Sequence, residues 1–435
     1  MNIKSISLQR YFLYLVIISA FMGTLLMTYK VGPIHIFPYR ILLVIMWSLF
    51  FGVIIFIDNG RLNLSQIKVK FYLSFFIFWL GYACFSIFWA AEKVDAIRNV
   101  IFLFTGISVV FFLIYYFHDI KHLYLLYRLW LIIFIIMIPV GFWEVTSGNH
   151  LIMSSLIEEE RSWIKFAPTA LFTNQNDFAT YIALTLPLVL VWIKYDSKLY
   201  SRIVGIVVFI AGLILLVLTI SRSCFMAVVI GLVFWFFFLN RFKHKIKVLV
   251  ITACVCLLII YIFPKQTMDY INIIKNQTSN LSDDGSLKGV VKDFNVRLNL
   301  VKNAIYFTGE SAGLGVGAGN AEYFMARYNI FPIAGHTNVH NWWAEILVNY
   351  GLLIFTGYLI MYFGLIFNLW RVHLKVENRI EKMICEGLLV GLVTFFIASI
   401  SSSSIIAFSP QWIYIGFILA LYNYNKINNS FKTLD

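Results

Sequence analysis

The chain has 435 residues, of which 61% are hydrophobic and only 13% are charged, and its mean hydropathy is +0.83. Soluble proteins carry about 25% charged residues, so this composition excludes a water-soluble fold. It also excludes a disordered chain, a collagen-like fibre and a small disulfide-stabilised domain. Apolar runs of about 15 to 24 residues recur from end to end, and this is the length that crosses the hydrocarbon core as a helix. We therefore predict an all-α polytopic membrane protein.

Twelve apolar runs are expected to span the membrane. The first begins at Tyr11, after Lys4 and Arg10, and has no convincing cleavage site, so we expect it to remain as a helix and not to be removed as a signal peptide. The expected spans are 11–29, 39–57, 71–90, 99–117, 129–143, 177–193, 203–220, 224–239, 248–263, 342–368, 384–406 and 411–424.

The spans and loops divide the chain into four predicted parts. Residues 1–143 hold the N-terminal transmembrane helices, and residues 144–263 hold the central ones with a turn at Arg222. Residues 264–341 form the one loop large enough to be a small domain, and residues 342–435 hold the C-terminal helices. Loops of this length are usually functional.

The charged residues predict an orientation. With both termini on the cytoplasmic side, that side holds 20 of the 34 basic residues and 7 of the 21 acidic ones, so the whole net charge of +13 lies there. Such a bias in the loops is the positive-inside rule. The basic character then reflects loops near anionic lipid, and we expect no nucleic-acid partner.

Arg222 lies between two apolar runs, with at most a tight turn around it. An ionisable group at membrane depth is costly and is therefore a candidate for function. One interpretation is a turn arginine whose long side chain reaches the outer headgroups. The other is an arginine that faces an outer cavity and binds an anion, with Ser221 and Ser223 adding hydrogen bonds. The planar guanidinium matches phosphate with paired donors and keeps its charge.

Residues 293–307 are predicted to form an amphipathic helix on the outer face. Arg297 lies beside its apolar stripe, where an ordinary polar-face residue is the simplest interpretation. The stripe consists of residues at helical spacing: Phe294, Leu298, Val301 and Ile305.

The next segment, 313–320, has glycine at every second position from 313 to 319. No strand is predicted before it, so a dinucleotide-binding loop is not expected. A turn whose backbone closely approaches another element is the preferred interpretation. A nest of backbone N–H groups for an anion is the alternative.

Two histidines precede the last long apolar run. Thr337 and Asn338 are suitable N-caps, which would place His340 in the first turn of the helix that re-enters the membrane. The helix dipole there disfavours a protonated imidazole, and a neutral histidine can accept a proton as a general base. His336 and His340 have the spacing of a zinc pair, but no acid stands at the zincin position and no third ligand is evident, so we expect no metal. A structural histidine at the membrane interface is the alternative.

A further polar patch begins the span at 177–193. Asn174 and Asn176 are good helix caps and turn formers, which is the simpler interpretation, and they are also suited to hydrogen-bond sugar hydroxyls.

Four separated segments together resemble one family. They are Phe172 to Asn176, the turn at Ser221 and Arg222, Arg297 ahead of the glycine segment, and His336 to Asn341 followed by Glu345 and Tyr350-Gly351. Their order and spacing, with one large outer loop late in the chain, resemble the O-antigen ligase and O-antigen polymerase superfamily, which includes teichuronic acid and capsule types. The resemblance covers residues 165 to 365, and Ala318 stands where many relatives carry proline.

The resemblance implies an inverting glycosyltransferase with a fold like that of the glycosyltransferase-C class, in the cytoplasmic membrane and with an extracytoplasmic active site. It implies that an undecaprenyl diphosphate-linked glycan is the donor, that Arg222 and Arg297 bind the diphosphate, and that His340 is the catalytic base. Two arginines would stabilise the leaving diphosphate, so no metal and no cofactor are expected. Contacts with the donor glycan or the acceptor glycan are expected from Asn174, Asn176, His336, Asn341 and Glu345.

Three functions remain open at this point. A polymerase would add the growing glycan to the next lipid-linked repeat unit, and a ligase would move the finished glycan to the lipid A core or a cell-wall acceptor. We favour a polymerase, because the abundance of Ile, Phe, Asn and Lys suggests a Gram-positive source, which would lack lipopolysaccharide. A flippase or exporter of lipid-linked oligosaccharide would need its basic residues in a cavity open to both sides, whereas Arg222, Arg297 and His340 all map to the outer side.

Overall fold

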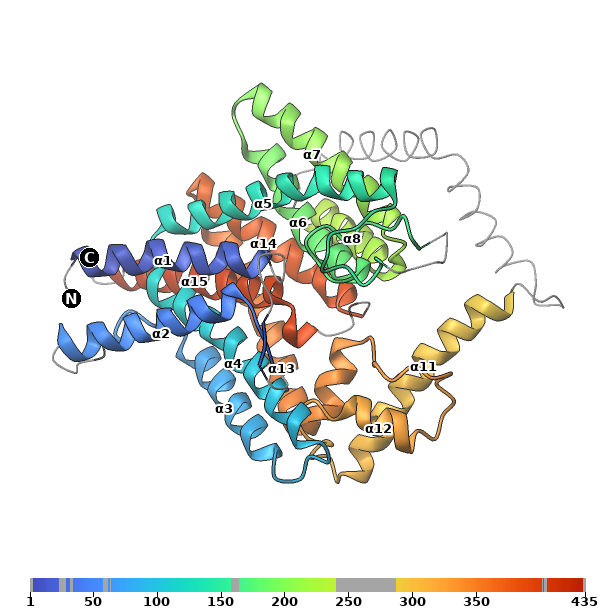
Figure 1. Cartoon of the computed structure of the whole chain (residues 1–435). Coiled ribbons are helices and arrows are strands. Elements are labelled where there is room, and N and C mark those ends of the chain that lie inside the picture. The colour runs from blue at the N-terminus through green and yellow to red at the C-terminus, as the bar shows by residue number, and fades with distance from the viewer. Residues whose placement is uncertain are drawn as a thin grey trace.

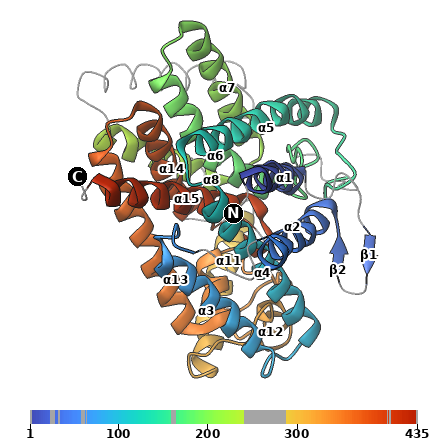
Figure 2. The same cartoon turned by 90° about the vertical axis from the view of Figure 1, so that its left-hand side faces the viewer.

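The computed structural model describes residues 3–22, 29–31, 34–57, 62, 64–157, 164–239, 287–400, 402 and 405–432. This part of the chain is almost entirely helical (Figures 1 and 2). Two short strands, β1 (Tyr29–Val31) and β2 (Ile34–Ile36), pair antiparallel and stand at the edge of the molecule beside α2 (Figure 2).

The described helices follow one another in chain order. They are α1 (Ile3–Met22), α2 (Pro38–Phe56), α3 (Lys70–Ser86), α4 (Lys93–Tyr116), α5 (Ile120–Ser147), α6 (Gln175–Tyr195), α7 (Leu199–Leu218), α8 (Arg222–Phe234) with a π-helical continuation (Trp235–Leu239), α11 (Leu287–Glu310), α12 (Ala321–Tyr328), α13 (Trp342–Lys375), α14 (Arg379–Ala398), a 3-10 turn (Ile405–Ala407) and α15 (Ser409–Lys432).

Seven described helices are long and apolar enough to cross a membrane: α2, α4, α5, α6, α7, α8 with its continuation, and α13. Shorter apolar helices lie at Leu8–Met22 and Lys70–Ser86. The prediction of an all-α polytopic membrane protein is therefore confirmed. The number of twelve spans stays a prediction, since the expected span at 248–263 lies outside the described residues, as does part of the large loop.

The bundle has two ends that differ in charge. We call one the basic end: it is formed by the starts of α1, α3, α5, α7 and α14 and by the ends of α4, α6, α13 and α15. The start of α1 and the end of α15 lie together at the left of Figure 1. The described basic residues that the sequence assigned to the cytoplasm are found there: Arg10, Lys68, Lys70, Lys121, Arg128, Lys194, Lys198, Arg202, Arg371, Lys375, Arg379, Lys382 and Lys426.

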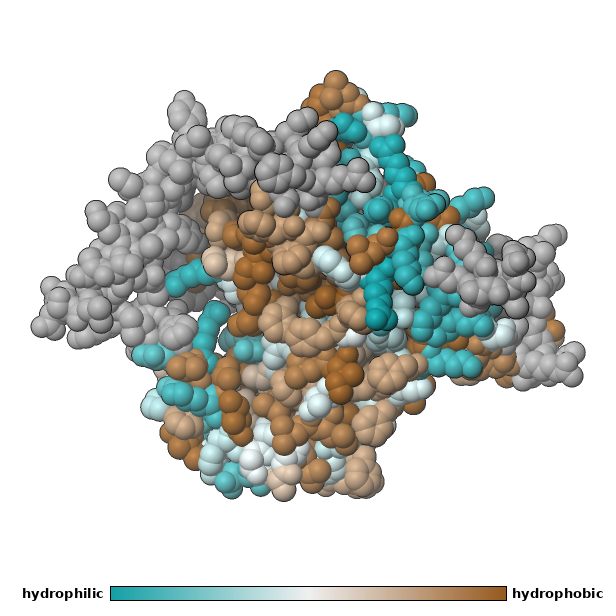
Figure 3. Space-filling model, turned by 180° about the vertical axis from the view of Figure 1, so that it is seen from behind, coloured by the Kyte–Doolittle hydropathy of each residue, from teal (hydrophilic) through white to brown (hydrophobic). Residues whose placement is uncertain are grey.

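We call the opposite end, where α6, α8 and α13 begin, the motif end. From behind, a broad hydrophobic surface occupies the middle of the molecule, and hydrophilic side chains gather on the right, toward the basic end (Figure 3). The predicted separation of charge along the membrane normal thus has a counterpart in the fold.

Helix α13 is broken near the motif end. Its 34 residues would measure about 51 Å if straight, against roughly 30 Å for the hydrocarbon core. The break is at Gly351, where φ is 75° and ψ is −175°. Residues 352–375 alone are long enough to span, so residues 342–350 are free to pack with α11 and α12.

The glycine segment 313–319 fills this break. A break in a helix leaves backbone groups without intrahelical partners. Here the Val316 and Gly317 amides donate to the carbonyls of Val348 and Asn349, at 2.8 and 3.1 Å, and the Leu352 amide donates to the Gly313 carbonyl at 2.8 Å.

Side chains are excluded from this contact. A Cβ on Gly315 would lie 2.5 Å from the Gly351 amide nitrogen, and φ at Gly315 is +81°, a region that favours glycine. The prediction of a close backbone approach is confirmed. The alternative, an anion nest, is wrong, because the amides that would form it donate to protein acceptors: Gly315 to Ser311 Oγ, Val316 and Gly317 to α13, and Ala318 to Ser86 Oγ.

Helix α11 confirms the amphipathic helix predicted at 293–307, but its apolar face was only half predicted. Leu298 and Ile305 of the expected stripe are exposed, at 42% and 56%. A second stripe packs instead against the loop before α13 and its first turns: Val296, Leu300, Ala304 and Phe307, which join Ile333, Val339 and Ala344 in one buried cluster. Helix α11 therefore has two apolar faces, one buried in this cluster and one exposed.

Candidate functional site

Three helix starts meet at the motif end, around the segment that follows α14. The Cys224 thiol near the start of α8 lies 3.8 Å from the Ala398 carbonyl oxygen. The Trp342 amide at the start of α13 donates to the Ser399 carbonyl at 3.1 Å. The Ser402 hydroxyl donates to the carboxylate of Asp177 in the first turn of α6. Segments that the sequence singled out far apart are thus joined through Ala398, Ser399 and Ser402.

Arg222 is the first residue of α8, and the turn that the sequence predicted before it is only three residues long. Ile220 in this turn has φ +62°, in the left-handed region, so the chain reverses sharply here. The Arg222 side chain is exposed and has no hydrogen-bond or ion-pair partner among the described residues. The helix dipole disfavours a positive charge at the start of α8. An anion bound there would be attracted both by the dipole and by the Arg222 guanidinium.

Arg297 is exposed on α11 and likewise has no partner in the described part of the chain. Its neighbour Val296 is buried in the cluster that includes Val339, one residue before His340. Farther along α11, the Asn299 amide donates to the Pro332 carbonyl at 2.9 Å. The structure therefore ties the helix that carries Arg297 to the loop that carries His340. No contact joins Arg297 directly to Arg222 within the described residues.

His340 does not lie in the first turn of α13, so that prediction is wrong. The cap is Asn341, whose side-chain oxygen accepts from the Trp343 and Ala344 amides at 3.1 and 3.3 Å. His340 precedes the cap, is half-buried, and has φ +48°. The predicted cap Asn338 instead accepts the His340 amide at 2.9 Å, in a tight turn. His340 is thus held in an uncommon backbone conformation beside the helix start, which is a frequent property of functional residues.

Two carboxylates flank this turn. Asn338 also donates through its Nδ2 to Glu322 Oε1 of α12, at 2.7 Å. Glu345, in the first turn of α13, lies close enough to Glu322 for their charges to interact. Asn338 therefore connects α12 with the backbone of His340, a role that the sequence did not distinguish from an ordinary cap. His336 is exposed, one turn away.

Asn174 has the capping role that was its simpler interpretation. Its side-chain oxygen accepts from the Asp177 amide at 2.9 Å, and its Nδ2 donates to Asp177 Oδ2 at 2.7 Å. The Asn176 carbonyl accepts from Thr180 Oγ1, which in turn lies 3.5 Å from the Cys224 thiol. The start of α6 is thereby fixed against the start of α8. Contacts of Asn174, Asn176 and Asn341 with a sugar remain predictions.

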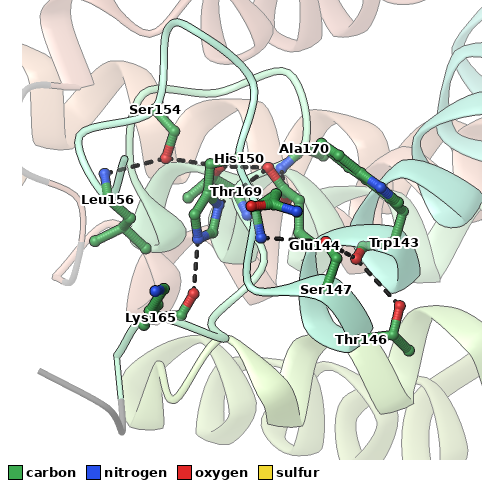
Figure 4. Close-up of polar contacts among 11 residues, drawn as sticks. Trp143, Glu144, Thr146, Ser147, His150, Ser154, Leu156, Lys165, Thr169 and Ala170 are labelled. Carbon is green, nitrogen blue, oxygen red and sulfur yellow. Dashed lines mark hydrogen bonds and ion pairs between the residues drawn. The ribbon is translucent and has the colours of Figure 1, made fainter. Parts of the chain in front are cut away.

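A buried carboxylate that the sequence analysis missed holds the loop before α6 (Figure 4). Glu144, in the last turn of α5, is fully buried and accepts from the amides of Thr169 and Ala170 at 2.7 and 2.6 Å and from Thr169 Oγ1 at 2.9 Å. His150 Nδ1 lies 3.2 Å from its Oε1, and His150 Nε2 lies 2.7 Å from the Lys165 carbonyl oxygen. This network fixes the approach of the chain to Asn174.

Residues 206–359 match a protein-family model described as O-Antigen ligase. The resemblance to the O-antigen ligase and polymerase superfamily is confirmed. The matched range contains Arg222, Arg297, His340 and Glu345, whereas Asn174 lies before it. The chain is also similar to the teichuronic acid biosynthesis protein TuaE of Bacillus subtilis (strain 168), with 29% identity over 418 residues, covering 94% of this chain and 83% of that protein.

Among the described residues, no group of three or more His, Cys, Asp or Glu side chains is placed to hold a metal ion. Cys224 and Cys385 are buried and Cys84 is exposed, all as free thiols.

Proposed function

We propose that this chain is an integral-membrane inverting glycosyltransferase that polymerises a lipid-linked glycan at the motif end of the bundle. The observation that carries the proposal is the meeting of the start of α8, which bears Arg222, with the start of α13, next to His340, on residues 398–402. The family match over 206–359 supports the reaction class, because it covers both residues.

The chemistry assigns one role to each group. An undecaprenyl diphosphate-linked glycan is the donor, and Arg222 and Arg297 bind its diphosphate, whose negative charge grows as it leaves. His340 takes the proton from the acceptor hydroxyl as the oxygen attacks the anomeric carbon. One displacement inverts that carbon. No metal and no cofactor take part.

The acceptor is placed by the groups around the His340 turn. Glu345 and Asn341 follow His340 at the start of α13, and Glu322 and Asn338 lie opposite on α12 and its following loop. Carboxylate and amide oxygens are suited to accept hydrogen bonds from sugar hydroxyls. Asn174, Asn176 and His336 contribute contacts farther from the reacting atoms.

The orientation follows from charge. The basic end faces the cytoplasm, where anionic lipid and the positive-inside rule favour it, and the motif end opens on the extracytoplasmic face of the cytoplasmic membrane. Cysteine labelling of intact cells tests this with Glu310→Cys and Glu377→Cys, both at exposed positions, in a chain without its native cysteines. An impermeant reagent should modify the first and not the second. The reverse pattern would place the motif end on the cytoplasmic face and would contradict the proposed orientation.

A polymerase is favoured over a ligase by the similarity to a teichuronic acid biosynthesis protein over 94% of this chain. The deciding experiment uses purified protein in detergent with lipid-linked repeat units as the sole substrate. A ladder of products that differ by one repeat unit is expected. Transfer of finished glycan only to a separate acceptor would indicate a ligase. The absence of transfer, with movement of the lipid-linked glycan across vesicles, would indicate an exporter.

A further inference from the structure

A cavity of about 600 Å³ opens at the basic end, far from the motif end, between the start of α5, the end of α6, and the starts of α7 and α14. Binding sites for small ligands occupy about 300 to 1,000 Å³. Its lining combines aromatic, basic and aliphatic side chains: Tyr124, Tyr127, Arg128, Leu131, Ile132, Ile135, Trp192, Tyr195, Asp196, Ser197, Lys198, Ser201, Arg379, Ile380 and Met383.

Three basic side chains come from three different helix termini. Arg128 lies on α5, Lys198 precedes α7, and Arg379 begins α14. The Arg128 guanidinium stacks over the Tyr124 ring at 6.0 Å, and Arg379 Nη2 donates to the Tyr195 carbonyl, so both keep further N–H donors. The Lys198 ammonium makes no side-chain hydrogen bond or ion pair within the described part of the chain, and its charge interacts with that of Asp196.

The one acidic residue of the lining is already held by the protein. Asp196 accepts from Ser201 Oγ at 2.6 Å, from the Lys198 amide at 2.9 Å and from Trp192 Nε1 at 3.2 Å. Ser201 and the Lys198 amide lower the pKa of Asp196, so it stays ionised. Three cations against one anion leave the lining with a net charge of +2.

The other wall of the cavity is apolar and partly exposed. Ile132 and Ile135 on α5 are 48% and 37% exposed, and Ile136 continues this stripe at 57%. They lie one to two turns beyond Arg128, about 6 to 12 Å deeper along the helix axis. Ile203 and Val207 on α7 present exposed apolar side chains at a comparable depth.

We propose that this cavity binds an anionic phospholipid, with its phosphodiester held by Arg128, Lys198 and Arg379 and an acyl chain along Ile132 and Ile135. Charge complementarity selects an anion, and basic pockets between transmembrane helices are suited to such headgroups. The exposed isoleucines distinguish a lipid from a soluble phosphate, which has nothing to place against them.

The test is native mass spectrometry of the purified, delipidated protein in detergent. An equimolar mixture of dioleoylphosphatidylglycerol and dioleoylphosphatidylcholine is added, and the retained lipid is counted. The wild type should retain phosphatidylglycerol about tenfold over phosphatidylcholine. The variant Arg128→Gln with Lys198→Gln should lose this preference.

A matched control comes from α13. Arg371 stacks over Phe367 as Arg128 stacks over Tyr124, four residues apart in both cases, and Lys375 is an exposed lysine at the same end of the bundle. The variant Arg371→Gln with Lys375→Gln removes the same charges outside the cavity and should keep the preference. Equal loss in both double variants would mean general attraction to a basic surface and would overturn the proposal.

A single variant and a competition experiment complete the test. If the double variant does not fold, the single variant Lys198→Gln, which breaks no described hydrogen bond or ion pair of the side chain, should still lower phosphatidylglycerol retention severalfold. Unchanged retention would overturn the proposal. Glycerol 3-phosphate at millimolar concentration should not displace the lipid. Full displacement would identify a site for a soluble phosphate ester instead.

Discussion

At the basic end, the fully buried carboxylate of Glu386 receives Lys194 Nζ at 2.5 Å, Trp235 Nε1 at 2.6 Å and the Tyr195 hydroxyl at 2.7 Å. At the motif end, Arg222 and Arg297 are exposed and have no partner among the described residues. Charged side chains thus have opposite surroundings at the two ends: buried with protein partners at the basic end, exposed without them at the motif end.

The difference separates charged groups that hold the helices together from charged groups that are available to bind a ligand. Glu386 on α14 joins α6 through Lys194 and Tyr195, and it joins α8 through Trp235 in the π-helical continuation. A buried carboxylate is tolerated only with such partners. The exposed guanidinium groups of Arg222 and Arg297 have no described protein partner, so binding of the proposed diphosphate would not require an internal ion pair to be broken.

The largest effect is expected from removing the base. His340→Ala should lower glycan transfer by about 10²- to 10⁴-fold, the usual contribution of one positioned base, without loss of folding. The measurement is the product ladder formed by purified protein from lipid-linked repeat units. His336→Ala is the matched control and should be milder, because this exposed side chain lies outside the turn that holds His340. A near-normal ladder from His340→Ala would remove it from the mechanism.

The next effect concerns stability at the basic end. Glu386→Ala should lower the free energy of unfolding in detergent by about 3 to 5 kcal/mol, because Lys194 loses its buried partner. Denaturant titration of the purified protein measures this. Arg222→Ala is the comparison and should change the same quantity by less than about 0.5 kcal/mol. If both variants were equally destabilised, the contrast between the two ends would not hold.

Donor binding at the motif end should depend on both charge and shape. Arg222→Ala and Arg297→Ala should each weaken binding of the lipid diphosphate by about 1.5 to 3 kcal/mol, the range for hydrogen bonds to charged groups. Arg222→Lys should be impaired less, since it keeps charge but loses the planar fork.

The double alanine variant should lose less than the sum of the single variants, because both arginines share one anion. Activity should also persist in EDTA. Additive losses would show that the arginines act at separate places.

The smallest effect is expected at Asn338, which acts through the position of His340. Asn338→Ala should reduce kcat by about tenfold, close to the net value of one or two hydrogen bonds, while KM for the donor changes little. Asn338→Asp keeps the oxygen that accepts the His340 amide and should recover more activity than alanine does. Equal losses of kcat in the two variants would show that Asn338 does not position His340 through this hydrogen bond.

The sequence predicted most of the fold because hydropathy and charge are local properties. Eleven of the twelve expected spans fall on described helices, and the boundaries of the turn around Arg222 were placed within two residues. The start of α13 was misplaced because Thr337, Asn338 and Asn341 are all suitable caps, and only packing decides among them. The contacts that Ala398 and Ser399 make with Cys224 and Trp342 could not be predicted from the sequence, because each joins residues more than 50 positions apart in the chain.

One missed residue had a usable signal. Glu144 is an acid within an apolar run, between Trp143 and Val145, and the reasoning that singled out Arg222 applies to it equally. Its partners Thr169 and Ala170 carried no such signal, because they contribute mainly backbone amides. The two apolar faces of α11 were likewise hidden, since a helix pattern does not say which face will find a partner.

The junction of Gly315 with Gly351 also orders the assembly of the chain during synthesis. The glycine segment lies against Ser86 and Glu92, which emerge from the ribosome much earlier, and against Asn349 and Leu352, which emerge later. The packing of the 287–341 region therefore cannot be completed until residues 349–352 have been synthesised, and the region must wait for a segment that is still being translated. Truncation of the nascent chain before residue 352 should leave this region sensitive to protease, although all of its own residues are present.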